Sequence, residues 1–293
     1  MNFSQLGKTL SLTAVLVVSA WGSHLLATES ANTVAKSAAE ENVVLASDVE
    51  WTPLNPLRGD KGPKAATLWG DRSGTGPSEF LVRFADGFSS PTHIHNVTYR
   101  GVVISGLVHN DDPDAVDMWM PAGSFWTQPA GEVHITATKG SNSVAYIEIE
   151  EAPYLVLPPN KAFDDGSRPI NVDASNIVWT DLLGVPASAV PPRVAFLWGD
   201  PQDSQPHGML VKLPAGYHGE LQTDGACNRA VVITGQIGHQ LLGGADMRKL
   251  EPGSYFSSSG NAVHRLSCDG ADECIIYTRT DGSIDFASAP SKN

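Results

Sequence analysis

Two histidines stand two residues apart in the segment SSPTHIHNVTYRG, at positions 93 and 95. The surrounding residues favour a β-strand, in which alternate side chains point to the same face, so His93 and His95 share one face. Two imidazoles on one face are what a single metal ion needs from one strand. A third histidine, His134, follows in a β-rich run behind Pro129 and Gly131. The pattern raises the question of whether the three converge.

The elements that must position these histidines occur twice in the chain. Five segments recur in the same order at a nearly constant offset, which indicates two copies of one domain of ordinary size. The matched pairs are Ala46–Leu54 with Ala174–Leu182, Ala65–Asp71 with Val194–Asp200, Phe80–Phe88 with Met209–Tyr217, Gly101–Asn110 with Ala230–His239, and Met120–Trp126 with Leu250–Phe256.

Each copy is predicted to be all-β. The runs EFLVRF, YRGVVISG, VAYIEIE and CIIYTRT are short, rich in β-branched and aromatic residues, and separated by turn residues. No long stretch has helical periodicity. We therefore predict a linker over residues 28–45, a first domain over 46–157 (the first repeat), a connector over 158–173 and a second domain over 174–287 (the second repeat).

The N-terminus has the layout of a secretory signal peptide. Lys8 precedes an apolar stretch from Leu10 to Ala20, and small residues follow at Ala20 and Ala27 as candidate cleavage sites. We predict a signal peptide over residues 1–27 and a secreted or periplasmic protein, with an uncleaved anchor as the alternative. The apolar stretch is short for a membrane span. Of the three cysteines, Cys268 and Cys274 flank a predicted hairpin loop, but a Cys227–Cys268 bridge is an equal alternative on sequence alone.

The charge of the chain limits its partners. The formal net charge is −13, from 32 acidic and 19 basic residues. Nucleic acid and anionic membrane surfaces would be repelled overall, so neither is expected to bind. A small-molecule ligand or substrate is the expected partner, and a homodimer is a further expectation.

The motif spacings around the three histidines resemble those of the cupin superfamily. The first cupin motif is matched by Gly87, His93, His95 and Gly106, and the second by Gly123, Pro129, Gly131 and His134. Through the duplication the whole chain resembles a bicupin. It is similar to exported cupins of a domain-of-unknown-function type and, more distantly, to acetylacetone-cleaving dioxygenases. The resemblance implies two tandem jelly-roll β-barrels.

The resemblance also implies a ligand set. Tyr99 stands where the cupin motif usually has a glutamate, which leaves His93, His95 and His134 as three neutral ligands. Three imidazoles leave a divalent metal its full charge and open positions; Fe(II) is favoured, with Zn, Mn or Ni as alternatives. Tyr99 is expected either to donate a hydrogen bond near the metal or to form the wall. Glu132, two residues before His134, is a candidate general base or hydrogen-bond partner.

The second repeat has lost most of this pattern. Alignment of Gly106 with Gly235 places Gln222 and Asp224 at the positions of His93 and His95, and Asn228 at that of Tyr99. A degenerate domain is one interpretation. The alternative is a second site for a metal or a polar molecule. It would be formed by one strand face and by His264, which matches His134. The residues on that face would be His218, Glu220, Gln222 and Asp224.

The sequence thus favours an exported metal-dependent enzyme, dioxygenase-like, that acts on a small organic molecule. A non-catalytic metal or ligand sensor is the first alternative, since the cupin fold alone does not define a function. An isomerase or hydrolase that uses Zn or Mn is the second.

Overall fold

The computed structural model describes residues 41–182 and 190–288. The predicted signal peptide and most of the predicted linker lie outside these residues. Within the described ranges, no helix has the length and apolarity needed to cross a membrane. The described chain is built from β-strands with short 3-10 segments, which confirms the all-β prediction. These segments are η1 (Pro56–Lys61), η2 (Pro159–Lys161) and η3 (Ala174–Asn176).

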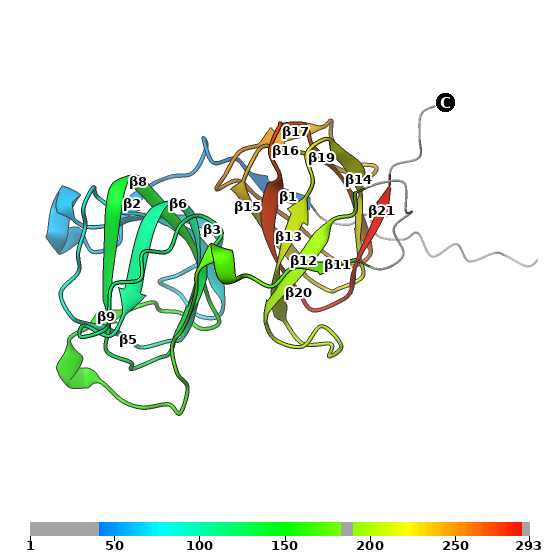
Figure 1. The fold of residues 1–293 in the computed structure, drawn as a ribbon. Helices are drawn as coiled ribbons and strands as arrows, with labels where there is room; N and C mark the ends of the chain where they lie inside the picture. Colours follow the sequence, from blue (N-terminus) through cyan, green and yellow to red (C-terminus); the bar gives the residue numbers. More distant parts are fainter. Residues whose placement is uncertain (1–40, 183–189, 289–293) are drawn as a thin grey trace, which may run out of the picture. The chain divides into compact units, whose positions relative to one another are not determined.

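Strands of the first repeat form an antiparallel sheet that ends in one strand of the connector (Figure 1). The sheet order is β10 (Ile170–Val172), β7 (Phe125–Gln128), β6 (Tyr99–Asp111), β8 (Ile135–Ile149), β4 (Ser78–Arg83), β3 (Lys64–Gly70) and β2 (Thr52–Pro53). A separate two-stranded sheet pairs β5 (Ile94–His95) with β9 (Val156–Leu157).

β6, which pairs with β8, has an irregularity at a glycine. Gly106 has a φ of 76°, and a Cβ atom there would collide with Ser143 on β8. The register of β6 shifts on both sides of Ser105, and the second shift spans this glycine, as in a β-bulge. The strand then continues to Asp111, whereas we expected it to end at Gly106. The continuation places Asn110 opposite Thr136, beside the metal centre described below.

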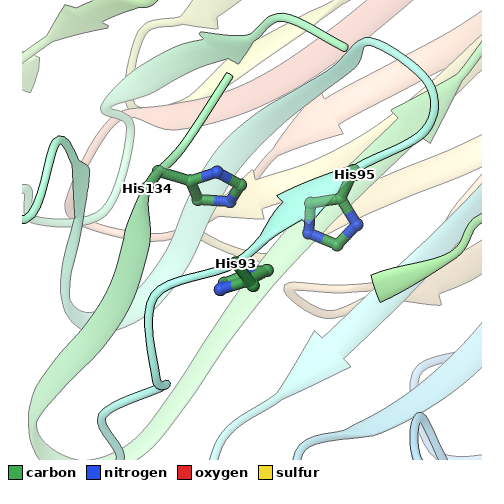
Figure 2. A group of neighbouring side chains, drawn as sticks. All are labelled: His93, His95 and His134. Carbon is green, nitrogen blue, oxygen red and sulfur yellow. The ribbon is translucent and has the colours of Figure 1, made fainter. Parts of the chain in front are cut away.

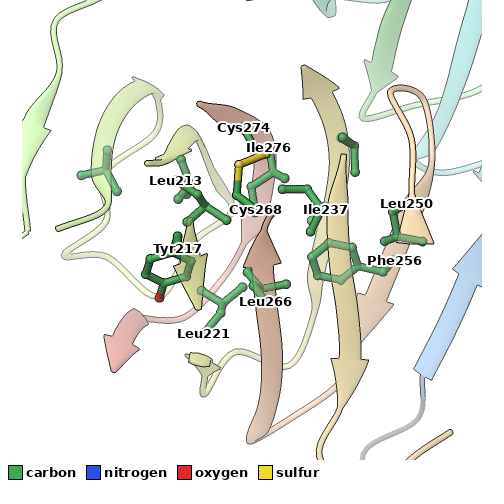
Figure 3. Close-up of a cluster of buried hydrophobic side chains, with 14 of the residues drawn as sticks. Leu213, Tyr217, Leu221, Ile237, Leu250, Phe256, Leu266, Cys268, Cys274 and Ile276 are labelled. Atoms are coloured by element: carbon green, nitrogen blue, oxygen red, sulfur yellow. A yellow bond between two sulfur atoms is a disulfide. The ribbon is translucent and has the colours of Figure 1, made fainter. Parts of the chain in front are cut away.

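The second repeat contributes to two sheets whose buried side chains form a shared core (Figure 3). The larger sheet is β1 (Glu41–Val44), β18 (Tyr255–Ser258), β15 (Asn228–Thr234), β20 (Cys274–Thr280), β13 (His207–Leu213), β12 (Arg193–Trp198) and β11 (Thr180–Asp181). The smaller is β17 (Arg248–Leu250), β16 (Ile237–Leu241), β19 (Ala262–Cys268), β14 (Tyr217–Thr223) and β21 (Ile284–Ser288).

A disulfide joins these two sheets. Cys268 at the end of β19 bonds to Cys274 at the start of β20, and both sit in the buried core. Cys227 is unpaired. Of the two pairings left open by the sequence, the structure therefore has the one across the predicted hairpin loop.

Each repeat receives an edge strand from outside its predicted bounds. β1, at the end of the predicted linker, pairs with β18 of the second repeat. β10, in the predicted connector, pairs with β7 of the first repeat. This exchange covers one sheet edge in each repeat. Residues Ala38–Asn293 form one compact unit, so the division into domains over 46–157 and 174–287 stays a prediction.

Contacts between the repeats are reciprocal. The guanidinium of Arg229 lies 3.3 Å from the ring centroid of Trp69, and that of Arg100, at the equivalent position of the first repeat, lies 3.7 Å from the ring of Trp198. Arg229 also pairs with the buried carboxylate of Glu79 at 2.9 Å. Equivalent surfaces thus face each other, as they do in a twofold-symmetric dimer.

Candidate metal centre

Two short backbone pairings hold the three histidines. His93 and His134 face each other as an isolated antiparallel bridge, and each backbone N–H donates to the carbonyl of the other at 3.0 Å. His95 is in β5, which pairs with β9. The alternation of residues 93 to 95 then brings both imidazoles to the same point, as predicted from their spacing.

The three imidazoles converge (Figure 2). One ring nitrogen from each of His93, His95 and His134 lies within 4.8 Å of the others. The ring centroids are 4.3 Å apart for His93 and His134, 5.0 Å for His93 and His95, and 5.3 Å for His95 and His134. The side chains are 9%, 3% and 0% exposed in chain order, so the cluster is withdrawn from bulk water.

Backbone carbonyls orient all three rings. Nδ1 of His93 lies 2.9 Å from the carbonyl of Pro91, Nδ1 of His95 lies 3.0 Å from that of Leu155, and Nδ1 of His134 lies 3.0 Å from that of Glu132. A carbonyl can only accept, so each Nδ1 carries the proton and each Nε2 keeps its lone pair. Such partners fix the tautomer of metal-binding histidines.

Burial keeps the cluster neutral. Desolvation, strengthened by the neighbouring imidazoles, lowers the pKa of His134 to about 3 and that of His95 well below its ordinary value. The pKa of His93 is also lowered, mainly by desolvation and further by the positive charge of Arg58. Three neutral imidazoles with aligned lone pairs are a donor set suited to a divalent metal such as Fe, Zn, Ni or Cu.

Tyr99, the residue at the usual glutamate position, belongs to a buried polar network beside the cluster. Its hydroxyl donates to Oδ1 of Asn110 at 2.9 Å and lies 3.4 Å from Nε2 of His134. Asn110 also accepts from Thr136 at 2.7 Å and donates to Gln128 at 2.9 Å. The network ties the phenol to the carbonyl acceptor of Asn110, and burial raises the pKa of Tyr99.

Tyr154 is a site residue that the sequence did not single out. Its ring stacks on His95 with centroids 4.2 Å apart, and its hydroxyl lies 3.1 Å from Nε2 of His95. The Asn96 side chain holds this segment by accepting from the backbone N–H of Leu155 at 2.8 Å and donating to the carbonyl of Pro153 at 2.9 Å. Tyr154 is in a loop without periodicity, so no sequence pattern could have placed it.

A cavity of about 240 Å³ opens onto His93, His95 and both tyrosines. Its wall is mainly apolar and aromatic, and one cation, Arg58, also lines it. The other lining side chains include Leu54, Val82, Phe84, Phe88, Trp126, Ile147, Val156 and Leu157. The volume is below that of sites for drug-sized ligands, so a small molecule is the appropriate occupant.

Glu132 does not have the position expected of a general base. Its backbone carbonyl orients His134, but its side chain lines a shallow surface hollow with Asp164 and Arg168 instead of the cavity. The reason is that Glu132 follows the Pro129–Gly131 turn, where strand alternation does not apply. His109 is 1% exposed because β6 continues past the bulge.

The second repeat does not bring its predicted residues together. In β14, Tyr217, Leu221 and Thr223 are buried, and the intervening side chains face outward. Leu221 pairs with His264, as His93 pairs with His134, so the true equivalent of His93 is Leu221 and not Gln222. The expected alignment was off by one residue, which reverses the face of every side chain on a strand.

The outward residues of this set have ordinary surface contacts. His218 pairs with Asp269, Glu220 pairs with Arg265, and Gln222 and Asp224 are exposed. His264 remains buried, but its Nδ1 lies 2.9 Å from Nε2 of His239 and its Nε2 lies 2.8 Å from the Ser258 hydroxyl. Within the described residues, the only group of three or more potential metal ligands is that of the first repeat.

The antiparallel sheets are those of a cupin-type fold, and the three-histidine cluster is a candidate metal-binding site. The chain belongs to the family described as domain of unknown function DUF4437, whose model matches residues 42–287. No curated protein sequence matches the chain significantly.

Solved structures with the same fold include three that are named for enzymes. A candidate dioxygenase from Nostoc punctiforme has 14% identity and a TM-score of 0.62, with 86% of this chain and 88% of that chain covered. A variant of salicylate 1,2-dioxygenase from Pseudoaminobacter salicylatoxidans in complex with gentisate has 15% identity and a TM-score of 0.52, with 86% and 87% covered. Oxalate decarboxylase from Lactobacillus farciminis in a formate complex has 11% identity and a TM-score of 0.53, with 84% and 88% covered. At these identities the likeness concerns the fold.

Proposed function

We propose that this protein is a bicupin that uses one divalent metal ion to oxidise a small organic molecule in the cavity of its first repeat. The observation that carries the proposal is the cluster of three imidazoles, with one ring nitrogen of each within 4.8 Å of the others and with each Nδ1 bonded to a carbonyl. His93, His95 and His134 would hold the metal. Fe(II) in a site with open positions supplies dioxygen chemistry.

The composition of the cavity favours oxidation over hydrolysis. A hydrolase or isomerase would need a general base within reach of its substrate. No aspartate or glutamate is among the cavity-lining residues of the described chain, and the Glu132 carboxylate lies elsewhere. The apolar wall is suited to exclude water from a reactive site.

Tyr99 and Tyr154 are the side chains that would act on the substrate. Both hydroxyls lie within 3.4 Å of a histidine Nε2 and belong to phenols whose pKa is raised by burial. Both therefore stay protonated. The Tyr154 hydroxyl, whose partner is the His95 nitrogen that a metal would bind, can donate a hydrogen bond to a carbonyl or enolate oxygen placed at the cluster, whereas the single O–H of Tyr99 is donated to Asn110 and leaves its oxygen as an acceptor. We assign them to orienting the substrate.

We also propose that the protein is exported. The proposal rests on the N-terminal pattern of residues 1–27, and it is supported by the Cys268–Cys274 disulfide, since disulfides persist in oxidising compartments. N-terminal sequencing of the protein recovered from the cell envelope or the medium would test it. A chain that begins at Met1 and stays in the cytoplasm would contradict it.

Oxygen uptake tests the enzymatic proposal. The protein would be loaded anaerobically with Fe(II) and then exposed to O₂ with a panel of 1,3-diketones and hydroxylated aromatic acids. We expect substrate-dependent O₂ consumption that is lost in His95→Ala and retained in His264→Ala, which removes a buried histidine of the second repeat. Iron binding without O₂ consumption for any panel member would contradict the proposal.

A further inference from the structure

The cavity is electrostatically one-sided. Among its lining residues Arg58 is the only side chain that carries a permanent charge, and no carboxylate is present. The chain as a whole has a net charge of −13, so its general field repels anions. A local cation at the wall of an apolar cavity therefore sets a preference that the rest of the molecule opposes.

Arg58 is held at the cavity by its local backbone. It lies in η1 (Pro56–Lys61), and its side-chain stem passes over Gly62, where a Cβ atom would come within 2.8 Å of Cβ of Arg58. The only ion pair of this segment in the described chain joins Asp60 to Lys64 at 3.2 Å. The Arg58 guanidinium has no ion pair or hydrogen bond within the described residues, so all of its donors are available to a ligand.

We propose that Arg58 recognises the carboxylate of the substrate, so that the site takes small organic acids with an apolar or aromatic body. This inference rests on the proposed function, whose substrate class it specifies. A guanidinium matches a carboxylate with two parallel N–H donors. The remaining walls, such as Val82, Phe84 and Ile147, offer apolar surface for the body of the acid. A phosphate ester, which carries up to two charges, would find only one cation here.

Equilibrium binding tests this assignment without any turnover. The purified full-length protein would be titrated calorimetrically, under anaerobic conditions, with benzoate and with benzamide, its neutral isostere. We expect benzoate to bind the parent more tightly than benzamide. Arg58→Gln should weaken benzoate binding about tenfold and leave benzamide binding unchanged. Arg58→Lys, which keeps the charge but loses the two-donor geometry, should give an intermediate loss.

Lys61→Gln is the matched control. Lys61 belongs to the same 3-10 segment and is exposed, but it does not line the cavity. Its substitution removes the same unit of charge. An equal loss of benzoate affinity in Arg58→Gln and Lys61→Gln would mean that only the net charge of the protein matters, and it would overturn the assignment. Failure of benzoate to bind at millimolar concentrations, or equal affinity for benzoate and benzamide, would overturn it as well.

The outcome is distinguishable from failure of the proposed function. Arg58-dependent carboxylate binding without oxygen consumption would support the assignment of Arg58 and contradict the dioxygenase. Oxygen consumption with neutral substrates, unchanged in Arg58→Gln, would support the dioxygenase and contradict the assignment of Arg58.

Discussion

The buried histidine pair of the second repeat predicts a loss of stability in acid. His239 and His264 lie 2.9 Å apart between Nε2 and Nδ1, an arrangement that needs one donor and one acceptor and is therefore lost when both rings are protonated. Burial, helped by the neighbouring imidazole and by Arg248, lowers the pKa of His239 to about 3, and burial lowers that of His264 to about 4. The Glu41 carboxylate, 3.7 Å from Nδ1 of His239, acts in the opposite direction without outweighing burial.

The magnitude follows from the difference between the folded and unfolded chains. The ordinary histidine pKa is 6.5, so the unfolded chain takes up protons below that pH while the folded chain does not until about pH 4. The free energy of unfolding is thus highest above pH 6.5 with respect to these two groups, and it falls as the pH decreases below that value. At about pH 5.5, each of the two histidines costs about 1.4 kcal/mol, or about 3 kcal/mol for the pair. That is a large part of the stability of an ordinary domain.

Urea unfolding of the metal-free protein at about pH 7.5 and about pH 5.5 measures this loss together with that from His93, His95 and His134, whose pKa is lowered as well, so the comparison of variants isolates the pair. His239→Asn introduces the residue that occupies the equivalent position, Asn110, in the first repeat. It should reduce the loss between the two pH values by about 1.4 kcal/mol. The control His218→Asn removes an exposed imidazole with a surface partner, Asp269, and should change the loss much less than His239→Asn does. An equal loss in the parent and in His239→Asn would refute the reasoning.

Three further predictions concern the fold. Arg229→Met leaves the Glu79 carboxylate buried without its partner and should lower the free energy of unfolding by about 3 kcal/mol. Addition of Glu79→Gln to this variant should recover most of the loss. An equal loss in the single variant Arg229→Met and in the double variant would contradict the pairing. Replacement of Cys268 and Cys274 by serine should cost about 2 kcal/mol, because the disulfide closes a short loop; unchanged urea unfolding would contradict this. Gly106→Ala places a Cβ at positive φ against β8 and should cost about 2 kcal/mol; an unchanged melting temperature would show that the bulge tolerates a side chain.

The first repeat was readable from the sequence because its key residues follow local rules. Strand alternation places His93 and His95 on one face, and the cupin-like spacing pointed to His134 as their partner. Tyr99 lies beside the cluster for the same reason. The positions of these residues depend on short backbone pairings of β-strand type, and the residue types around them favour β-strands.

The expected site of the second repeat is wrong because the register of β14 follows its local pattern and not a fixed offset along the chain. In β14, Tyr217, Leu221 and Thr223 alternate with polar residues, and this alternation alone indicates that the polar face is outside. Alignment from the glycine of the following strand crossed a loop and moved the register by one residue. Binary patterning is the better guide wherever a loop separates the reference residue from the strand.

Other site residues depend on tertiary structure that local patterns do not contain. Tyr154 and Arg58 come from a loop and a 3-10 turn, and they meet the cluster only because β9 pairs with β5 and η1 packs at the cavity. The edge strands β1 and β10 are likewise short, and each pairs with a strand of a repeat outside whose predicted bounds it lies. Long-range pairings of this kind leave little trace in a single sequence.

The metal content of the purified protein tests the central claim most directly. The parent, His134→Ala and His264→Ala would be prepared without a metal-binding tag, and their metal content would be measured by inductively coupled plasma mass spectrometry. Both histidines are 0% exposed and occupy equivalent positions in the two repeats, so a general cost of removing a buried imidazole affects both variants alike. We predict about one divalent metal ion per chain in the parent and in His264→Ala, and its loss in His134→Ala. Metal retained in His134→Ala, or lost equally in both variants, would contradict the three-histidine site.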